Sequence, residues 1–371
     1  MAVRRSWWWR KVLYPCLAWL VLAGCSDPAQ PAVMEGACAY LWAMQGSDGG
    51  WHSATHGILK EGAAITPFIV WHLLAADEAP PHGAPERALD FIRNTLAERT
   101  GQEIMDYPNY AAAYALRVLH QYGEPADSGR IRVLVDELVA QQFVASRGMD
   151  RDHPAYGGWG FGETGLAPGQ AGHVDLSHTR RVLQALSAVL PAEHPAFAEA
   201  IVYLKRHQNL PPEADSGVYA DGGFFTSMHT AYTNKSRQYT DIPPRWESYA
   251  TATADGLLGL LAVPENQQHR IAAAVQWLQQ HDALEYVEGI PQDDPAQWHL
   301  VMQYYHLAVR AEALANAGVG GAWQQAVQTM LLQAQRPDGS FANPLGGPNK
   351  EDDPLLATAF AVTALSYAGS L

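Results

Sequence analysis

Apolar and polar positions along the chain alternate between two kinds of helix. The first kind has apolar residues at helical spacing and a polar back, as at Ile131, Leu134 and Leu138. The second kind is apolar nearly all round, as in 355–368 (LLATAFAVTALSYA) and 251–262 (TATADGLLGLLA). A helix without a polar face must be covered on every side. We therefore expect the second kind to form an inner layer that the first kind surrounds.

The alternation of the two kinds predicts six pairs of one outer and one inner helix. We place them at 33–46 with 66–76, 85–98 with 109–122, 129–144 with 176–190, 195–208 with 247–262, 267–281 with 297–316, and 321–335 with 354–369. The loops within pairs are longer than those between pairs, so the long loops should gather at one end. The expected fold is all-α, a single closed (α/α)6 toroid with a binding mouth at that end.

A Gly-rich loop with an aromatic residue recurs between an outer and an inner helix. Its clearest copies are Gln45–Trp51, Tyr156–Phe161, Asp221–Phe225 and Gln335–Phe341. Glycine permits the positive φ of a sharp turn, and Asp can accept hydrogen bonds from loop N–H groups. The aromatic ring would then wedge between neighbouring helices. We interpret the loop as mainly a structural staple, with direct ligand contact as the alternative.

The first residues of the chain predict a targeting segment. Four basic side chains precede residue 12, the stretch 12–24 is apolar, and Leu22–Cys25 closes it. This resembles a bacterial lipoprotein signal, with 1–24 as signal peptide, Cys25 as the lipidated residue and 25–32 as a tether before a domain at 33–371. The prediction that follows is a protein of the bacterial cell envelope, anchored in the membrane through the lipid on Cys25 and facing the periplasm or exterior.

Charge and cysteine content exclude several kinds of chemistry. The formal net charge is −14 and no cluster of Lys and Arg occurs after the leader, which argues against a nucleic-acid partner. The only cysteine after Cys25 is Cys38, which we expect to be a packing residue. No His-Cys pattern with metal-ligand spacing is present, so neither a metal nor another cofactor is expected.

The repeated Gln…Asp-Gly-Gly-aromatic loops and the inner helices that follow them resemble the repeats of squalene–hopene cyclases. They are also similar to the α/α-toroid prenyltransferases and to bacterial squalene-cyclase-like proteins, most closely in 156–186. The resemblance covers 33–371 and implies an isoprenoid-like ligand and acid-initiated isomerisation or cyclisation. The Asp-x-Asp-Asp motif of the cyclases and the zinc-binding Cys of the prenyltransferases are both missing, and the chain has room for one ring only.

Two carboxylates are candidates for proton donors. Asp175 opens an inner helix near His173 and His178, where the alternative role is a helix cap. Asp255 lies in an otherwise apolar inner helix and needs a partner or a raised pKa; the alternative role is an ion pair with a neighbouring Arg.

Aromatic residues and one histidine at the expected mouth are candidate ligand contacts. Those selected are Tyr110, Tyr114, Trp159, Phe161, His178, Phe224, Tyr249, Trp298 and Tyr305. We expect a lipid-anchored toroid that binds an apolar, isoprenoid-like small molecule. A non-catalytic envelope scaffold and a carbohydrate-active (α/α)6 enzyme are the alternatives. The pattern identifies no protein partner.

Overall fold

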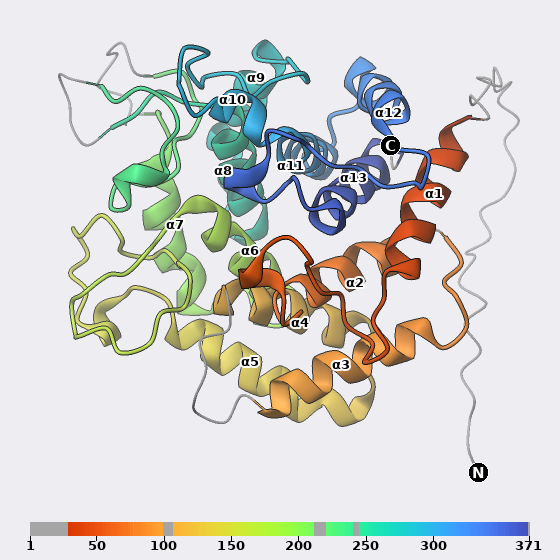
Figure 1. Cartoon of the computed structure of the whole chain (residues 1–371). Helices are drawn as coiled ribbons and strands as arrows, with labels where there is room; N and C mark the ends of the chain where they lie inside the picture. Colours follow the sequence, from red (N-terminus) through yellow and green to blue (C-terminus); the bar gives the residue numbers. More distant parts are fainter. Residues whose placement is uncertain (1–28, 77, 99–106, 211–219, 240–244, 370–371) are drawn as a thin grey trace, which may run out of the picture.

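The computed structural model describes residues 29–76, 78–98, 107–210, 220–239 and 245–369 (Figure 1). Within these ranges the chain is helical, with two isolated β-bridges and no strand. The expected signal peptide, Cys25 and the first part of the tether lie outside the described residues.

Six helices form the inner ring. They are α2 (Ile65–Ala75), α4 (Pro108–Tyr122), α6 (Leu176–Leu186), α8 (Ala250–Ala262), α11 (Gln303–Asn316) and α13 (Pro354–Ala368). Each of them packs against the next, and α13 packs against α2, so the ring is closed (Figure 1). The predicted toroid is confirmed.

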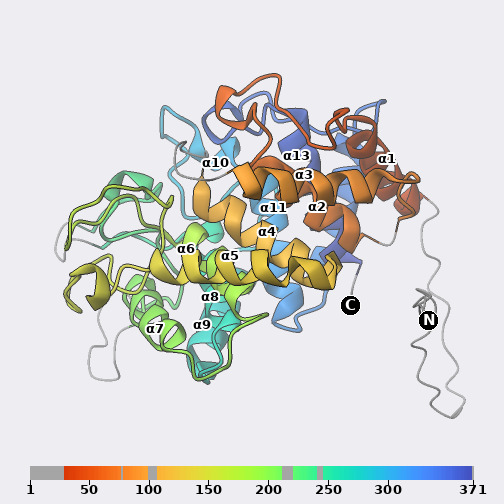
Figure 2. The same ribbon diagram turned by 90° about the horizontal axis from the view of Figure 1, so that it is seen from below.

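Six further helices lie outside the ring (Figure 2). They are α1 (Ala29–Ala43), α3 (Ala84–Glu98), α5 (Ser128–Ala140), α7 (Pro195–His207), α9 (Gln268–Gln280) and α12 (Ala322–Ala334). Helix α1 begins inside the segment expected as a tether. Burial follows the two sequence patterns: α8 is buried at every residue from Ala250 to Leu260, whereas α5 buries only Leu134 and Leu138.

The recurring loop is a staple, as its sequence predicts. In all four copies the backbone N–H of the wedge aromatic donates to a threonine hydroxyl on the following inner helix, at 2.9–3.0 Å. The donor and acceptor residues are Trp51 with Thr66, Trp159 with Thr179, Phe224 with Thr253, and Phe341 with Thr358. The wedge rings are fully buried in the core.

A glutamine at the end of the preceding outer helix ties each staple to the next outer helix. Its Nε2 donates both to a loop glycine carbonyl and to a carbonyl at the start of that helix. The four glutamines and their distant carbonyls are Gln45 with Ala84, Gln142 with Ala196, Gln208 with Arg270, and Gln335 with Val33. The last tie, at 2.9 Å, joins α12 to α1 and so closes the outer layer.

The loop glycines allow the close approach that these ties require. Gly157 has φ +88°, and a Cβ at that position would lie 2.1 Å from the carbonyl oxygen of Glu199 on α7. Any other residue would therefore be strained in its backbone and would collide with the next helix.

The fifth inner helix is broken where we expected one continuous helix over 297–316. The short helix α10 (Trp298–Val301) is separated from α11 by Met302. The backbone N–H groups of Tyr304 and Tyr305 at the start of α11 donate to the buried carboxylate of Glu351, at 2.9 and 2.8 Å. A distant carboxylate thus supplies the cap that the local sequence lacks.

Short 3-10 helices mark the connections: Gly57–Leu59, Pro125–Asp127, Ala145–Arg147, Ala231–Thr233 and Gly347–Asn349. Cys38 is buried on α1, and burial raises the pKa of its thiol to about 12, in keeping with a packing role. Among the described helices, none combines the length and the apolar character that crossing a membrane requires.

Candidate functional site

A cavity of about 430 Å³ lies at the centre of the ring. All six inner helices contribute to its wall, each through residues of its first two turns, and the remaining wall comes from the long loops. The helix contributions include Phe68, Tyr114, Arg181, Asp255, Tyr305 and Phe360. The cavity therefore opens at the end of the ring where the loop lengths predicted a mouth.

Aromatic rings cover much of the wall and pack edge to face. Phe68 lies at the centre of one group, with ring centroids 5.1 Å from Tyr114 and 5.3 Å from Phe360. Tyr305 packs on the other side of Phe360 at 5.4 Å. Such walls offer apolar area and the negative faces of π systems to a ligand.

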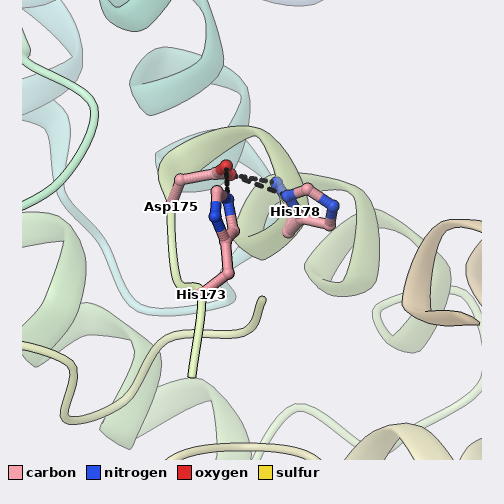
Figure 3. Close-up of side chains that lie close together, drawn as sticks. All are labelled: His173, Asp175 and His178. Atoms are coloured by element: carbon pink, nitrogen blue, oxygen red, sulfur yellow. Dashed lines mark hydrogen bonds and ion pairs between the residues drawn. The ribbon is translucent and has the colours of Figure 1, made fainter. Parts of the chain in front are cut away.

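Asp175 caps α6 and holds two histidines (Figure 3). Its Oδ1 accepts from the backbone N–H of His178 at 2.8 Å, from Nδ1 of His178 at 2.9 Å and from the hydroxyl of Ser177 at 2.9 Å. Its Oδ2 lies 2.6 Å from Nε2 of His173, whose ring stacks on Phe161 at 3.7 Å. Asp175 is therefore both the cap of α6 and the centre of the polar site.

The charge on Asp175 is fixed by these neighbours. Burial alone would raise the pKa of its carboxyl, but His178 and His173 hold that pKa well below its usual range. Asp175 is therefore ionised at neutral pH and is a poor proton donor, which argues against one role expected from the sequence. Burial lowers the pKa of His178, so its ring is neutral.

The two nitrogens of His178 have different surroundings. Because Nδ1 donates to Asp175, Nε2 carries the free lone pair. Nε2 is buried and has no hydrogen-bond partner within the described residues. In Figure 3 this nitrogen points away from Asp175. A neutral imidazole that lines a cavity and is oriented by a carboxylate is equipped to accept a proton or a hydrogen bond from a ligand.

The same cluster has the composition of a metal site. Ligand atoms of His173, Asp175 and His178 all lie within 4.8 Å of one another, and two His with one carboxylate suit a divalent transition metal. Each ring nitrogen next to the carboxylate is already hydrogen-bonded to it, and Oδ1 accepts three hydrogen bonds. A metal would have to displace these bonds, so we interpret the cluster as a hydrogen-bonded one.

Asp255 takes part in a buried ion-pair network, as one of the two sequence interpretations expected. Its Oδ1 accepts from Nε of Arg180 at 2.8 Å, and its Oδ2 accepts from the hydroxyl of Tyr305 at 2.6 Å. Arg180 also donates to Glu312 on α11 at 2.9 Å. Burial raises the pKa of Asp255, although Arg180 and Arg181 oppose the shift.

Arg181 lies beside this network in an aromatic setting. Its guanidinium carbon is 4.4 Å from the ring centroid of Tyr110 and 5.4 Å from that of Tyr305. The carboxylate of Asp255 is 3.9 Å away, and the buried Nε has no partner among the described residues. Arg181 thus brings a buried, partly satisfied cation to the wall.

Seven of the nine candidate ligand contacts line the cavity: Tyr110, Tyr114, Phe161, His178, Tyr249, Trp298 and Tyr305. Asp175 and Asp255 line it as well. Trp159 and Phe224 do not, because each is the wedge ring of a staple and is fully buried in the core. Contact of these side chains with a ligand stays a prediction.

The cations of the wall were not predicted from the sequence; they are Arg181, Lys235 and Lys350. One signal was available. The chain has only five lysines: Lys11, Lys60, Lys205, Lys235 and Lys350. Three of them, Lys60, Lys235 and Lys350, lie in the long loops that were expected to form the mouth, and the last two line the cavity.

Comparison with solved structures places the fold among α/α toroids. The ligand-free type II terpene cyclase MstE from Scytonema is 14% identical with a TM-score of 0.53, over 91% of this chain and 98% of that one. An unsaturated glucuronyl hydrolase specific for heparin is 12% identical with a TM-score of 0.59, over 92% and 97%. A possible member of the GH105 family from Salmonella enterica is 13% identical with a TM-score of 0.54, over 96% and 98%.

These identities show a shared fold and not a shared activity. By sequence, no protein-family model and no curated protein matches the chain.

Proposed function

We propose that the central cavity binds an apolar, isoprenoid-like small molecule. The observation that supports the proposal is the aromatic wall, to which all six inner helices and the long loops contribute. A cavity of about 430 Å³ falls in the usual size range of small-molecule sites. Burial of hydrocarbon against such a wall is favourable by about 25 cal/mol per Å².

The chemistry that we assign to this site is proton acceptance by His178. A ligand O–H or acidic C–H next to Nε2 would transfer its proton there, giving an imidazolium that Asp175 stabilises through Nδ1–H. This differs from the acid-initiated reaction that the family resemblance implied. Asp175 is ionised, and both oxygens of Asp255 accept hydrogen bonds from Arg180 and Tyr305.

Native mass spectrometry of the purified full chain, followed by organic extraction, tests ligand binding. We expect an apolar molecule to be released and geranylgeraniol to raise the melting temperature. Repeated preparations that release no apolar molecule and show no shift with geranylgeraniol would rule the proposal out.

Two variants that fill the cavity locate the binding site. Ala64 and Leu356 line it, so Ala64→Trp and Leu356→Trp should both abolish the thermal shift by occupying the space. Leu332→Trp is the matched control, because Leu332 is exposed on the outer helix α12. Binding that survives both cavity variants would place the ligand elsewhere.

Carbohydrate cleavage is the second candidate function, and one observation favours it. Asp175 and Asp255 line the same cavity, and their surroundings move their pKa values in opposite directions. Pairs of carboxyls separated in this way are typical of acid–base catalysis on glycosides. Release of reducing ends from acidic oligosaccharides, lost in both Asp175→Asn and Asp255→Asn, would support it.

We also propose that the ring is held at the bacterial cell envelope by a lipid on Cys25, after removal of 1–24. Support comes from the leader sequence alone. Metabolic labelling with a radioactive fatty acid should mark the wild-type chain and leave Cys25→Ser unlabelled. Equal labelling of the two would contradict the anchor.

A further inference from the structure

We infer that the ligand of the central cavity carries a carboxylate or phosphate group, and that Lys235 and Lys350 bind this group. The inference rests on the proposed function, since it assigns a charge to the molecule expected in that cavity. It follows from the charges of the wall, which differ in sign from the charge of the whole protein.

Lysine is concentrated at this cavity. The chain is acidic overall, with 38 Asp and Glu against 24 Lys and Arg, and it has five lysines. Of the three lysines outside the wall, Lys11 precedes the described residues, Lys60 is exposed in the loop before α2, and Lys205 lies on the outer helix α7. Lys235 and Lys350 come from two separate loops and line the same cavity. Lys350 directly follows the 3-10 helix Gly347–Asn349, and Lys235 is the second residue after the 3-10 helix Ala231–Thr233.

Neither of these two ammonium groups has a carboxylate partner. Lys235 Nζ lies 3.9 Å from the ring centroid of Trp298 and donates to the backbone carbonyl of Tyr232 at 3.3 Å. Lys350 Nζ donates to the hydroxyl of Tyr107 at 3.0 Å. Within the described residues no Asp or Glu oxygen lies within 4.0 Å of either Nζ. Each group has N–H donors to spare for a ligand.

The carboxylates of the wall hydrogen-bond to other groups and act on the lysines only from a distance. Burial lowers the pKa of Lys235, and the charges of Asp294 and Asp175 oppose that shift. Asp175 accepts from His173 and His178, and Asp255 accepts from Arg180 and Tyr305. The lining has three cations, Arg181, Lys235 and Lys350, against the two carboxylates of Asp175 and Asp255, so its formal charge is positive.

Arg181, one turn inside α6, differs from the two lysines because a carboxylate, that of Asp255, lies 3.9 Å from it. Its buried Nε is unpartnered, and the side chain is only 4% exposed. An unsatisfied buried donor is costly to a protein. Cations on a low-dielectric wall attract anions more strongly than the same cations in water.

A set of ligands with one chain and different head groups tests the inference. Calorimetry on the purified full chain would compare geranylgeraniol, geranylgeranic acid and geranylgeranyl phosphate, with glucuronate as an anion that lacks the apolar chain. We expect the acid and the phosphate to bind on the order of tenfold or more tighter than the alcohol, as charged hydrogen bonds allow. Added salt should reduce the ratio of the affinity for the acid or the phosphate to the affinity for the alcohol.

Matched variants assign the preference to the two lysines. In the double variant Lys235→Met and Lys350→Met, the acid should bind no tighter than the alcohol, while the affinity for the alcohol stays within a few-fold. The charge-conserving pair Lys235→Arg and Lys350→Arg should keep the preference. Lys205→Met removes the same charge from α7, where Lys205 lies 3.8 Å from Glu265, and should change nothing.

The outcomes separate the inference from the proposed function. Equal binding of all three geranylgeranyl compounds, or a preference that survives the double methionine variant, would overturn the inference and leave the apolar ligand standing. Lysine-dependent binding of glucuronate without binding of any geranylgeranyl compound would support the anion site and overturn the apolar ligand. No binding of any of the four would overturn both.

Discussion

His178 Nδ1 lies 2.9 Å from Oδ1 of Asp175, and this one contact decides which nitrogen of the histidine keeps a free lone pair. The carboxylate fixes the tautomer with a proton on Nδ1. Nε2 is left as a buried acceptor without a partner among the described residues, on a side chain that lines the cavity.

Asp175→Asn should separate the two roles of this residue. Asn caps helices about as well as Asp, so the stability of α6 should be nearly unchanged, whereas Asp175→Ala should cost about 1 kcal/mol. Both changes remove the negative charge that opposes the burial-driven lowering of the pKa of His178, so that pKa should fall further. NMR titration of the imidazole together with chemical denaturation would check this; a rise in the pKa would contradict the assignment.

Removal of metal should leave the protein unchanged, because hydrogen bonds alone account for the cluster of His173, Asp175 and His178. We expect dialysis against EDTA to leave the melting temperature unaltered, and elemental analysis to find no stoichiometric transition metal in the untreated protein. One bound zinc per chain, lost in His173→Ala, would show instead that the cluster is a metal site.

Gln335→Leu should destabilise the ring by about 2–3 kcal/mol, because it removes two hydrogen bonds and leaves the carbonyls of Val33 and Gly339 without this donor. Gln142→Leu removes the two corresponding hydrogen bonds from the tie between α5 and α7, and it should cost a similar amount. Gln276→Leu, on the exposed face of α9, is the control. Urea denaturation measures all three; a loss at Gln335 no larger than at Gln276 would mean that the closing tie contributes nothing.

Arg180→Met should cost about 3–5 kcal/mol, because it leaves the buried carboxylates of Asp255 and Glu312 without their cation. Adding Asp255→Asn and Glu312→Gln to the same chain should recover part of the loss, since the uncompensated charges are then gone. A triple variant that is less stable than Arg180→Met alone would contradict the view that the loss comes from the uncompensated charges of Asp255 and Glu312.

Stability should decrease as the pH falls below about 6.5, the ordinary value for histidine. Burial lowers the pKa of His207 to about 3, and its Nε2 accepts from the backbone N–H of Met228. Between these pH values the unfolded chain binds a proton that the folded chain does not, so stability is present above 6.5 and is lost toward pH 3. His72 and His306 behave alike, with pKa values lowered to about 3 and about 4.

His207→Gln should therefore reduce the slope of stability against pH by up to about 1.4 kcal/mol per pH unit in this window. His269→Gln on the exposed face of α9 controls for the loss of a histidine. Denaturation curves from pH 4.5 to 7 give the slope, and an unchanged slope in His207→Gln would refute the assignment.

The fold could be predicted because the clearest inner helices differ in pattern from the outer ones, although the inner helix α6 carries Arg180 and Arg181. Helices with no polar face, such as α8 and α13, have to be enclosed, and six alternating pairs suffice to close a ring. The break at Met302 could not be predicted, since the cap of α11 comes from Glu351, which is distant in sequence.

The aromatic residues of the site could be predicted only in part, because aromatic residues serve both as buried wedges of the staples and as lining of the cavity. Aligning the four loops on the glycine with positive φ would have identified the wedges. Trp51, Trp159, Phe224 and Phe341 each follow that glycine by two positions. Phe161 falls outside this position and lines the cavity instead.

The protonation of Asp175 depends on three-dimensional contacts that the sequence does not encode locally. His173 and His178 were both recognisable neighbours in the sequence, but their hydrogen bonds to the two oxygens of Asp175 were not. The two contacts together turn an expected acid into a fixed anion.

The tie between Gln335 and Val33 joins the last helix pair to the first in the same manner as the other ties join neighbouring pairs. Structurally, the molecule therefore has no first repeat. A circularly permuted chain that starts at α3 and runs through α13 into α1 would keep every one of these ties, and the order in which the pairs are synthesised would be free to change.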